Sequence, residues 1–441
     1  MSAKKKIKQS VAIVTLGCKV NQYESASFVS GFEELGLAVV SVKEEADVCV
    51  VNTCAVTGKA GAQSRQLIRK VLRDHPKARV VVTGCYAQIA SQEIVELAGR
   101  PICIVGNGYK HLLVDIALAE QHCDLEMYMG DISRQRQISE LPVRRFAERT
   151  RAYLKVQDGC NRFCSYCIVP YARGRCRSLA PDKVLAQVET FVAEGYRELV
   201  VTGIHTGAYG QDLEPAVTLL DLLGSVANRF PGLRYRLSSL EPMEISDEML
   251  AFIAATDCMM PHLHIPLQSG DDGVLKRMNR RYTGRQFGDI VNRCVERIPG
   301  AAMGVDVLVG FPGETEEAFR NTYDLLESLP VTYLHVFPYS SRPGTVAASM
   351  ADQLPKQVKE ERVALLRQLD HKKRTAFYLS QVGTVQRVLA ENARNRLRRM
   401  RGFSENYLPV HFKAPAELAN QVVPVRIDRV EDGSVFGSLV E

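Results

Sequence analysis

Short apolar runs alternate with amphipathic stretches along the first 140 or so residues of this 441-residue chain. The apolar runs have the length of buried strands, and they lie at Val11–Leu16, Val48–Val51, Val80–Thr83 and Ile102–Val105. Helix-like segments separate them, for example Gln22–Leu35 and Lys59–Arg73. Buried strands that alternate with helices predict a parallel α/β domain, which we place at residues 1–140.

The same alternation returns after a polar segment at 128–150, which looks like a linker. Six further strands are expected at Ala152–Val156, Glu198–Thr202, Arg234–Ser238, Leu263–Pro266, Ala302–Val309 and Thr332–Phe337. Six strands are too few for a closed eight-stranded barrel, so residues 146–375 are expected to form a partial (β/α)6 barrel. In such folds the active residues gather at the carboxyl ends of the strands.

The pattern changes after a highly charged helix at 355–375, which looks like a solvated connector. Val382–Leu389, Tyr407–Phe412 and Val422–Ile427 are β-like, and no long helix separates them. This pattern predicts a small, OB-like β-barrel over residues 376–441.

Composition places the chain among ordinary globular proteins, with 46% hydrophobic and 24% charged residues. No apolar run is long enough to span a bilayer, and the basic start lacks the apolar stretch of a signal peptide. We therefore expect a cytoplasmic protein without a membrane partner. In that compartment its 12 cysteines are more often metal ligands than disulfides.

Cys160, Cys164 and Cys167 form a C-x-x-x-C-x-x-C triplet. Three thiolates at this spacing can hold three irons of a [4Fe–4S] cluster and leave the fourth iron open for a ligand that is not protein. The alternatives are chance clustering or a zinc site, but zinc sites usually show two C-x-x-C pairs or Cys/His mixtures and close all four positions. The triplet is similar to that of radical S-adenosylmethionine (SAM) enzymes, in which the open iron binds SAM.

A second triplet is predicted from topology. Cys18, Cys54 and Cys85 each follow one of the first three major strands. The carboxyl ends of parallel strands meet at one edge of a sheet, where open α/β sheets bind ligands. The three thiols should converge there on a second cluster. The alternative is that they are small buried residues at strand ends, because free cysteine packs well.

Other candidate groups are less specific. Gly203, Ser239, Glu241 and Gln268 lie at predicted strand ends of the barrel and are candidate SAM contacts. His205 and His264 also lie at strand ends, although a lone histidine is more often a structural hydrogen-bonding group than a base. No catalytic residue is predicted beyond the cluster ligands.

A run of arginines in the last domain, followed by Phe403 and Tyr407, suggests RNA binding. Basic residues beside aromatic ones on a small β-barrel suit single-stranded or loop RNA, whereas the alternative is an ordinary solvated face. The candidate RNA contacts are Arg394, Arg396, Arg398, Arg399 and Arg401.

Together these features resemble the methylthiotransferase family of radical SAM enzymes over nearly the whole chain. The runs that carry the resemblance are Thr15–Asn21, Asn52–Cys54, Thr83–Cys85, Cys160–Gly174, Leu267–Gly270 and Met278–Arg280, and the tail resembles the RNA-binding TRAM domain. One departure is Cys176, at a position where the family would have a serine or threonine.

The resemblance implies two [4Fe–4S] clusters, an auxiliary one held by Cys18, Cys54 and Cys85 and a SAM-cleaving one held by Cys160, Cys164 and Cys167. One SAM would methylate a sulfur carried by the auxiliary cluster, and another would supply the radical that activates the C2–H bond of adenine. The implied partners are a tRNA anticodon stem-loop, an electron donor and a sulfur source.

The run around Cys18 and the run around Cys160 look most like the MtaB branch, which modifies N6-threonylcarbamoyladenosine at tRNA position 37. Three alternatives stay open: a MiaB-like enzyme for isopentenyladenosine, a RimO-like enzyme for an aspartate of a ribosomal protein, and a non-catalytic iron–sulfur RNA-binding or electron-transfer protein.

Overall fold

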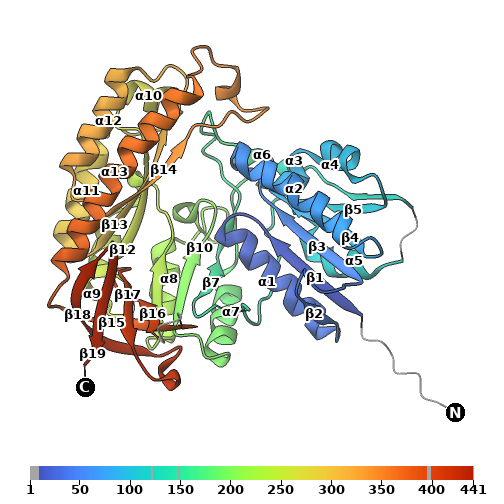
Figure 1. Ribbon diagram of the computed structural model, residues 1–441, viewed down its shortest axis with the longest axis horizontal. Coiled ribbons are helices and arrows are strands. Elements are labelled where there is room, and N and C mark those ends of the chain that lie inside the picture. Colours follow the sequence, from blue (N-terminus) through green and yellow to red (C-terminus); the bar gives the residue numbers. More distant parts are fainter. Residues whose placement is uncertain (1–8, 121–122, 148, 395–398, 441) are drawn as a thin grey trace.

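The structure is a computed structural model that describes residues 9–120, 123–147, 149–394 and 399–440. Figure 1 shows the N-terminal sheet and its helices at the right of the molecule and a curved array of strands and helices at the left. A small C-terminal barrel lies below that array. The predicted fold class is confirmed in all three parts.

The N-terminal sheet has six parallel strands in the order β2-β1-β3-β4-β5-β6. Because β1 pairs with β2 on one side and β3 on the other, the chain changes direction across the sheet between β1 and β3. A ligand crevice forms at such a switch point, outside the carboxyl ends of the strands. The strands are β1 (Ser10–Thr15), β2 (Ala38–Val40), β3 (Val48–Thr53), β4 (Arg79–Gly84), β5 (Ile102–Val105) and β6 (Leu125–Tyr128).

Both faces of this sheet are buried, which explains why its strands are almost continuously apolar. Val50 belongs to the core beneath α1 and Val51, its neighbour, to the core on the opposite face with Ile68 of α2. Thr57 begins α2 by accepting a hydrogen bond from Ala60 N at 3.1 Å. The helices here are α1 (Lys19–Glu34), α2 (Gly58–Asp74), α3 (Cys85–Ile89), α4 (Ser91–Ala98) and α5 (Leu113–Leu118).

The second part contains the six predicted barrel strands. They form two parallel sheets, β11-β10-β7 and β12-β13-β14, which an isolated bridge between Tyr235 and Met259 joins into one curved array. The strands are β7 (Ala152–Lys155), β10 (Glu198–Thr202), β11 (Arg234–Leu237), β12 (His262–Gln268), β13 (Ala302–Val309) and β14 (Tyr333–Pro338). A short pair, β8 (Gln157–Asp158) and β9 (Arg177–Ser178), flanks the cysteine loop.

Helices cover the outer face of the array, as Figure 1 shows for α10 to α13. Thr218 and Thr283 form capping boxes that define the first residues of α8 and α11. The helices are α6 (Val169–Arg173), α7 (Pro181–Ala193), α8 (Leu219–Arg229), α9 (Asp247–Ala255), α10 (Asp272–Arg277), α11 (Gly284–Arg297), α12 (Glu316–Ser328) and α13 (Lys356–Ser380).

Two segments differ from their sequence-based interpretation. The polar segment 128–150 is not a free linker, because Leu141, Val143 and Phe146 are buried in the main core. The charged helix α13 is not merely a solvated connector, because Leu366 and Leu369 bury one face of it. In both segments, a few apolar residues spaced among charged ones pack against the rest of the protein. The short strands β2 and β6 were not predicted.

The C-terminal part is a closed barrel with the strand order β15-β16-β17-β19-β18. Closure removes exposed strand edges, and an inner row of Val388, Val410 and Val425 forms the core. Of its strands, β16 and β19 were not predicted. The strands are β15 (Val385–Arg394), β16 (Arg399–Phe403), β17 (Pro409–Lys413), β18 (Val422–Glu431) and β19 (Ser434–Leu439).

The C-terminal barrel docks on the amino ends of the central strands. Arg236 of β11, which is 2% exposed, donates to the carbonyls of Ser404 and Glu405 at 3.1 and 2.9 Å and pairs with Glu198 at 2.9 Å. None of the helices in the described ranges is long and apolar enough to cross a membrane.

Candidate active site

The three N-terminal thiols lie where the topology predicted, at the carboxyl edge of the sheet. Cys18 is the N-cap of α1 after β1, Cys54 follows β3, and Cys85 begins α3 after β4. A side chain on Gly17 would place its Cβ only 3.0 Å from Cys54 Sγ, so a glycine is needed for this close approach. Burial and then the neighbouring Cys85 raise the pKa of Cys54 to about 11. Cys18 is the exposed member of the group.

The spacing of these thiols suits a cluster better than a single ion. Ligand sulfurs around one tetrahedral zinc ion would lie about 3.8 Å apart, given a Zn–S distance of about 2.3 Å. Among the described residues, the one group of three such ligand atoms that all lie within 4.8 Å of one another is His264, Asp306 and His335, so neither cysteine triplet closes on one ion. Three thiols whose sulfurs do not all lie within 4.8 Å of one another could instead each bind a separate iron of an iron–sulfur cluster.

The triplet of Cys160, Cys164 and Cys167 occupies a loop between β8 and α6, and backbone hydrogen bonds hold the shape of this loop. Cys160 N donates to Gly174 O at 3.0 Å, and Cys167 N donates to Cys164 O at 2.9 Å. Burial and then Cys164 raise the pKa of Cys167 to about 12. An iron ion bound by Cys167 would displace this proton, so the loading of a cluster at this loop would depend on pH.

The loop is supported by residues that follow α10, in a run that the family resemblance had indicated without a role. Asn279 Nδ2 donates to the carbonyls of Arg162 and Phe163 at 3.3 and 3.0 Å. Arg280 Nη1 donates to Cys164 Sγ at 3.5 Å and also pairs with Glu241 at 3.0 Å. Arg280 places a fixed positive charge beside Cys164, one of the predicted cluster ligands.

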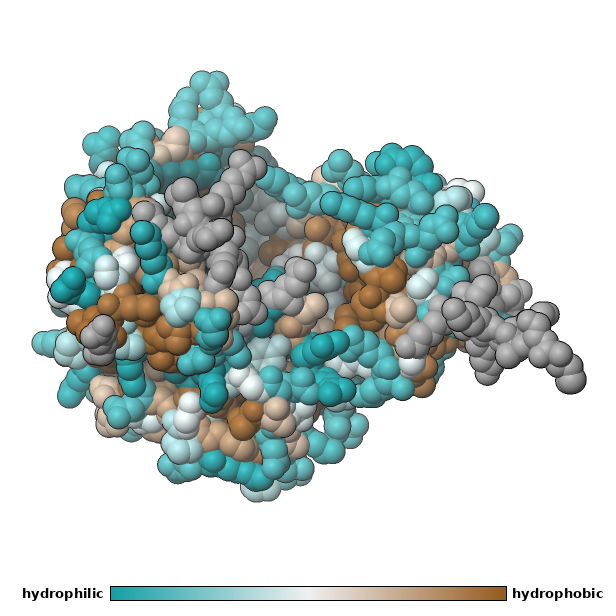
Figure 2. Space-filling model, turned by 60° about the horizontal axis from the view of Figure 1, so that its bottom comes forward, coloured by the Kyte–Doolittle hydropathy of each residue, from teal (hydrophilic) through white to brown (hydrophobic). Residues whose placement is uncertain are grey.

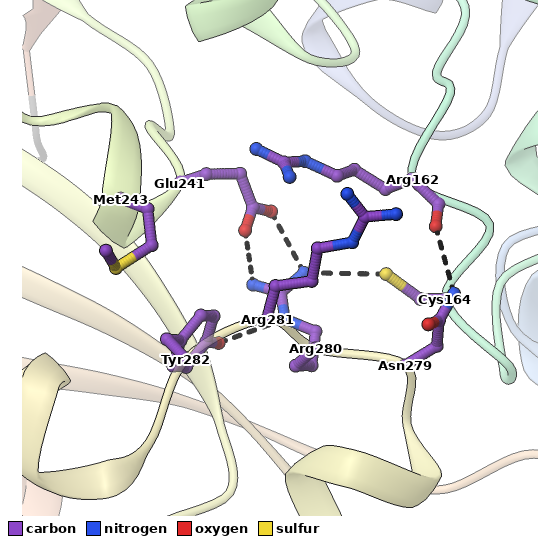
Figure 3. A pocket seen from close by; sticks show the side chains of 8 residues that line it. All are labelled: Arg162, Cys164, Glu241, Met243, Asn279, Arg280, Arg281 and Tyr282. Carbon is purple, nitrogen blue, oxygen red and sulfur yellow. Dashed lines mark hydrogen bonds and ion pairs between the residues drawn. The ribbon is translucent and has the colours of Figure 1, made fainter.

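Figure 3 shows the pocket that opens beside Cys164, with the Glu241–Arg280 pair at its centre. Of the four predicted SAM contacts, only Glu241 lines it. Its lining residues are Arg162, Cys164, Glu241, Met243, Asn279, Arg280, Arg281 and Tyr282.

The other three candidate SAM residues lie at strand ends but outside that pocket. Gly203 is packed against Gln157, whose Oε1 would lie 2.9 Å from an added Cβ. Ser239 is exposed, and Gln268 ends β12 with φ +68°. Their role toward SAM remains a prediction.

Both candidate histidines make structural contacts. His205 Nε2 lies 2.6 Å from Glu244 Oε1, and its Nδ1 lies 3.9 Å from Cys176 Sγ. The Cys176 sulfur also lies 3.8 Å from Gly159 O. The unexpected cysteine therefore contacts the backbone directly before Cys160. His264 Nε2 lies 2.8 Å from Asp306 Oδ1.

A buried charge network, which sequence reasoning missed, joins the two cysteine sites. Arg173, 1% exposed, follows Cys167 at the end of α6 and reaches Glu24 of α1 at 2.9 Å and Asp158 at 3.0 Å. Burial raises the pKa of Glu24, but Arg173, Lys110 and Lys155 outweigh that effect and hold it below its usual range. Helix α6 also packs on α3, which begins at Cys85.

Of the candidate RNA contacts, Arg396 and Arg398 lie outside the described residues, and the side chains of Arg394 and Arg399 do as well. Arg401 is exposed, and its guanidinium lies 5.2 Å from the centre of the Phe403 ring. Phe403 in turn stacks on Tyr407 with the ring centres 4.8 Å apart. A cation over stacked aromatic rings is an arrangement that binds nucleobases.

Comparison with known proteins agrees with this site. The sequence profile of the radical SAM superfamily matches residues 154–326, and that of the uncharacterized protein family UPF0004 matches residues 10–106. The radical SAM methyltransferase TsrM from Kitasatospora setae has a similar fold, with a TM-score of 0.55 at 18% identity over 78% of this chain and 74% of that one. Fold and cysteine loop together define a radical SAM enzyme.

Similarity to proteins of known name shows to which family of radical SAM enzymes the chain belongs. The chain is 40% identical to the threonylcarbamoyladenosine tRNA methylthiotransferase MtaB of Bacillus subtilis, over 95% of this chain and 93% of the relative. It is 39% identical to the Aquifex aeolicus protein of the same name, over 93% and 98%. A tRNA-2-methylthio-N(6)-dimethylallyladenosine synthase from Pelotomaculum thermopropionicum is 33% identical over 94% of each chain. The chain belongs to the radical SAM methylthiotransferase family, whose members use SAM and a [4Fe–4S] cluster.

Proposed function

We propose that this enzyme transfers a methylthio group to C2 of N6-threonylcarbamoyladenosine at position 37 of tRNA. The observation that carries the proposal is the pair of separate three-thiol sites, one at the switch point of the N-terminal sheet and one in the barrel. Each offers three protein ligands and leaves one iron open. The relatives from Bacillus subtilis and Aquifex aeolicus, at 40% and 39% identity, are named for this nucleoside.

The two three-thiol sites have different roles in this proposal. Cys160, Cys164 and Cys167 hold the cluster that cleaves SAM, and Glu241, Gly203, Ser239 and Gln268 lie at the strand ends around it. Cys18, Cys54 and Cys85 hold the auxiliary cluster that carries the sulfur. When bound, the two clusters and SAM supply a methylated sulfur and a radical able to remove the C2 hydrogen of adenine.

The chain's own residues orient the reactants. Arg280 and Asn279 hold the SAM-site loop, and the network around Arg173 fixes that loop against the N-terminal sheet. C2 lies on the edge of the base, so the nucleotide turns out of the anticodon stack to reach both sites. Arg401 and its neighbours Arg394, Arg396, Arg398 and Arg399 hold tRNA phosphates without reading sequence.

The proposal includes three domains, at 1–140, 146–375 and 376–441, and a cytoplasmic enzyme that draws on an electron donor and a sulfur source there. Cytoplasm is where its tRNA substrate is found.

Iron content tests the two sites separately. The protein should bind about eight irons, as two [4Fe–4S] clusters require. Replacing Cys160, Cys164 and Cys167 by alanine should leave about four and abolish 5′-deoxyadenosine formation, whereas replacing Cys18, Cys54 and Cys85 should abolish only methylthio transfer. Full iron retention in either variant would contradict the assignment.

Nucleoside analysis of tRNA from a strain lacking the gene tests the substrate. The expected change is loss of 2-methylthio-N6-threonylcarbamoyladenosine. Loss of the isopentenyl derivative instead would assign the chain to the dimethylallyladenosine enzymes, and turnover only of a ribosomal protein would reject tRNA as the substrate.

A further inference from the structure

Lys19 occupies an unusual position beside the auxiliary site. It is the first residue of α1 and follows Cys18 directly, so its backbone is next to one of the proposed cluster ligands. Its side chain is solvent-exposed, yet it lies within electrostatic range of Arg151, Arg236 and Asp306, which belong to the second part of the chain. Lys19 therefore belongs to the side of the N-terminal part that is turned toward the barrel, and Figure 2 shows a recess in the surface between these two parts.

The charged groups opposite Lys19 are already compensated. Arg236 pairs with Glu198 at 2.9 Å. Arg151 pairs with Glu391 at 3.4 Å and covers the Phe403 ring at 4.3 Å.

Asp306 is also satisfied, since its Oδ1 lies 2.8 Å from His264 Nε2 and 3.3 Å from His335 Nδ1. The Lys19 ammonium makes no hydrogen bond or ion pair with any residue that the structure describes. Because the two arginines opposite it are paired with carboxylates, Lys19 is the uncompensated cation of this set of described residues, and an uncompensated cation favours a bound anion.

The proposed substrate carries an anion in the required place. C2 and the N6 substituent of adenine flank N1 on the same edge of the base. When C2 approaches sulfur at the auxiliary cluster, the N6 substituent therefore points toward residues beside the cluster ligands. The threonylcarbamoyl group ends in a carboxylate, whereas a dimethylallyl group is uncharged.

We propose that Lys19 binds the carboxylate of the threonylcarbamoyl group and selects that nucleoside over one with an uncharged N6 substituent. This inference rests on the proposed function, and it names a specificity residue for it. A charge-assisted hydrogen bond in a partly enclosed site strengthens binding by about tenfold or more.

The test uses the full-length enzyme with both clusters and two anticodon stem-loop RNAs. One RNA carries threonylcarbamoyladenosine, and the other carries the same group with its carboxylate converted to a neutral carboxamide. The wild-type enzyme should prefer the carboxylate at least about tenfold in kcat/KM. Equal turnover of the two RNAs by the wild-type enzyme would overturn the inference without any variant.

Variants then assign the preference to Lys19. Lys19→Met keeps the apolar stem but removes the charge, so it should lose the preference for the carboxylate, and Lys19→Arg should recover most of it. Lys70→Met, an exposed lysine of α2, is the matched control and should keep the preference. Iron content shows whether the adjacent site in Lys19→Met is intact.

The outcomes separate the two proposals. If Lys19→Met lowers turnover of both RNAs by the same factor, Lys19 does not read the carboxylate. If the wild-type enzyme turns over neither RNA but modifies an isopentenyladenosine stem-loop, the proposed function fails first.

Discussion

Replacing Glu24 by glutamine should strongly destabilise the protein. Glu24 is 1% exposed and contacts three cations: Lys110, Arg173 at 2.9 Å and Lys155 at 3.6 Å. Together with Asp158, the network holds three cations and two carboxylates, and the variant would leave three cations facing one carboxylate. Removing one partner of a buried ion pair costs about 3–5 kcal/mol.

Lys110 decides most of this effect. It is 2% exposed, and among the described residues its ion pair is the one to Glu24. Adding Lys110→Met to Glu24→Gln removes the stranded charge, so the double variant should be more stable than Glu24→Gln alone.

Urea unfolding followed by far-ultraviolet circular dichroism measures these differences. Glu327→Gln, which breaks the exposed pair with Lys372, is the control and should change stability by no more than about 0.5 kcal/mol. The reasoning would be refuted if Glu24→Gln lay within about 1 kcal/mol of the wild type, or if the double variant were no more stable than the single one.

Three further predictions concern backbone geometry, pH and RNA. Gly84→Ala should cost at least about 2 kcal/mol in urea unfolding, because φ is +99° and the new Cβ would lie 2.3 Å from Thr53 O. Gly99→Ala, with φ +59° and open space around it, should cost less. The folded-state pKa of Glu24 is depressed to about 2, so its stabilising contribution is present above the unfolded pKa of about 4.3 and should be lost as the pH falls from about 4.3 toward about 2. Over this pH range the urea midpoint should fall less steeply in Glu24→Gln than in the wild type. Arg401→Ala should reduce the slope of log tRNA affinity against log salt by about 0.7 to 0.9, and an unchanged slope in filter binding would show that Arg401 contacts no phosphate.

The local placement of the cysteines was predictable from the sequence. Cys160, Cys164 and Cys167 lie within one loop, so their spacing in the sequence already brings the three thiols close together. The convergence of Cys18, Cys54 and Cys85 also followed from the sequence, because parallel strands with right-handed crossovers bring their carboxyl ends to one edge. The apolar runs of the N-terminal sheet were recognisable because both of its faces are buried.

Partners far apart in the chain were decided only by the tertiary structure. Nothing in the sequence pairs Glu24 with Arg173, or aims Lys19 at Arg151, Arg236 and Asp306. Such contacts depend on how the N-terminal sheet docks against the barrel. Apolar faces govern this docking, and their pattern in the sequence does not show which polar residues will meet when the faces pack. A charged residue in an amphipathic helix looks solvated in the sequence, and only packing shows that it is buried against an opposite charge.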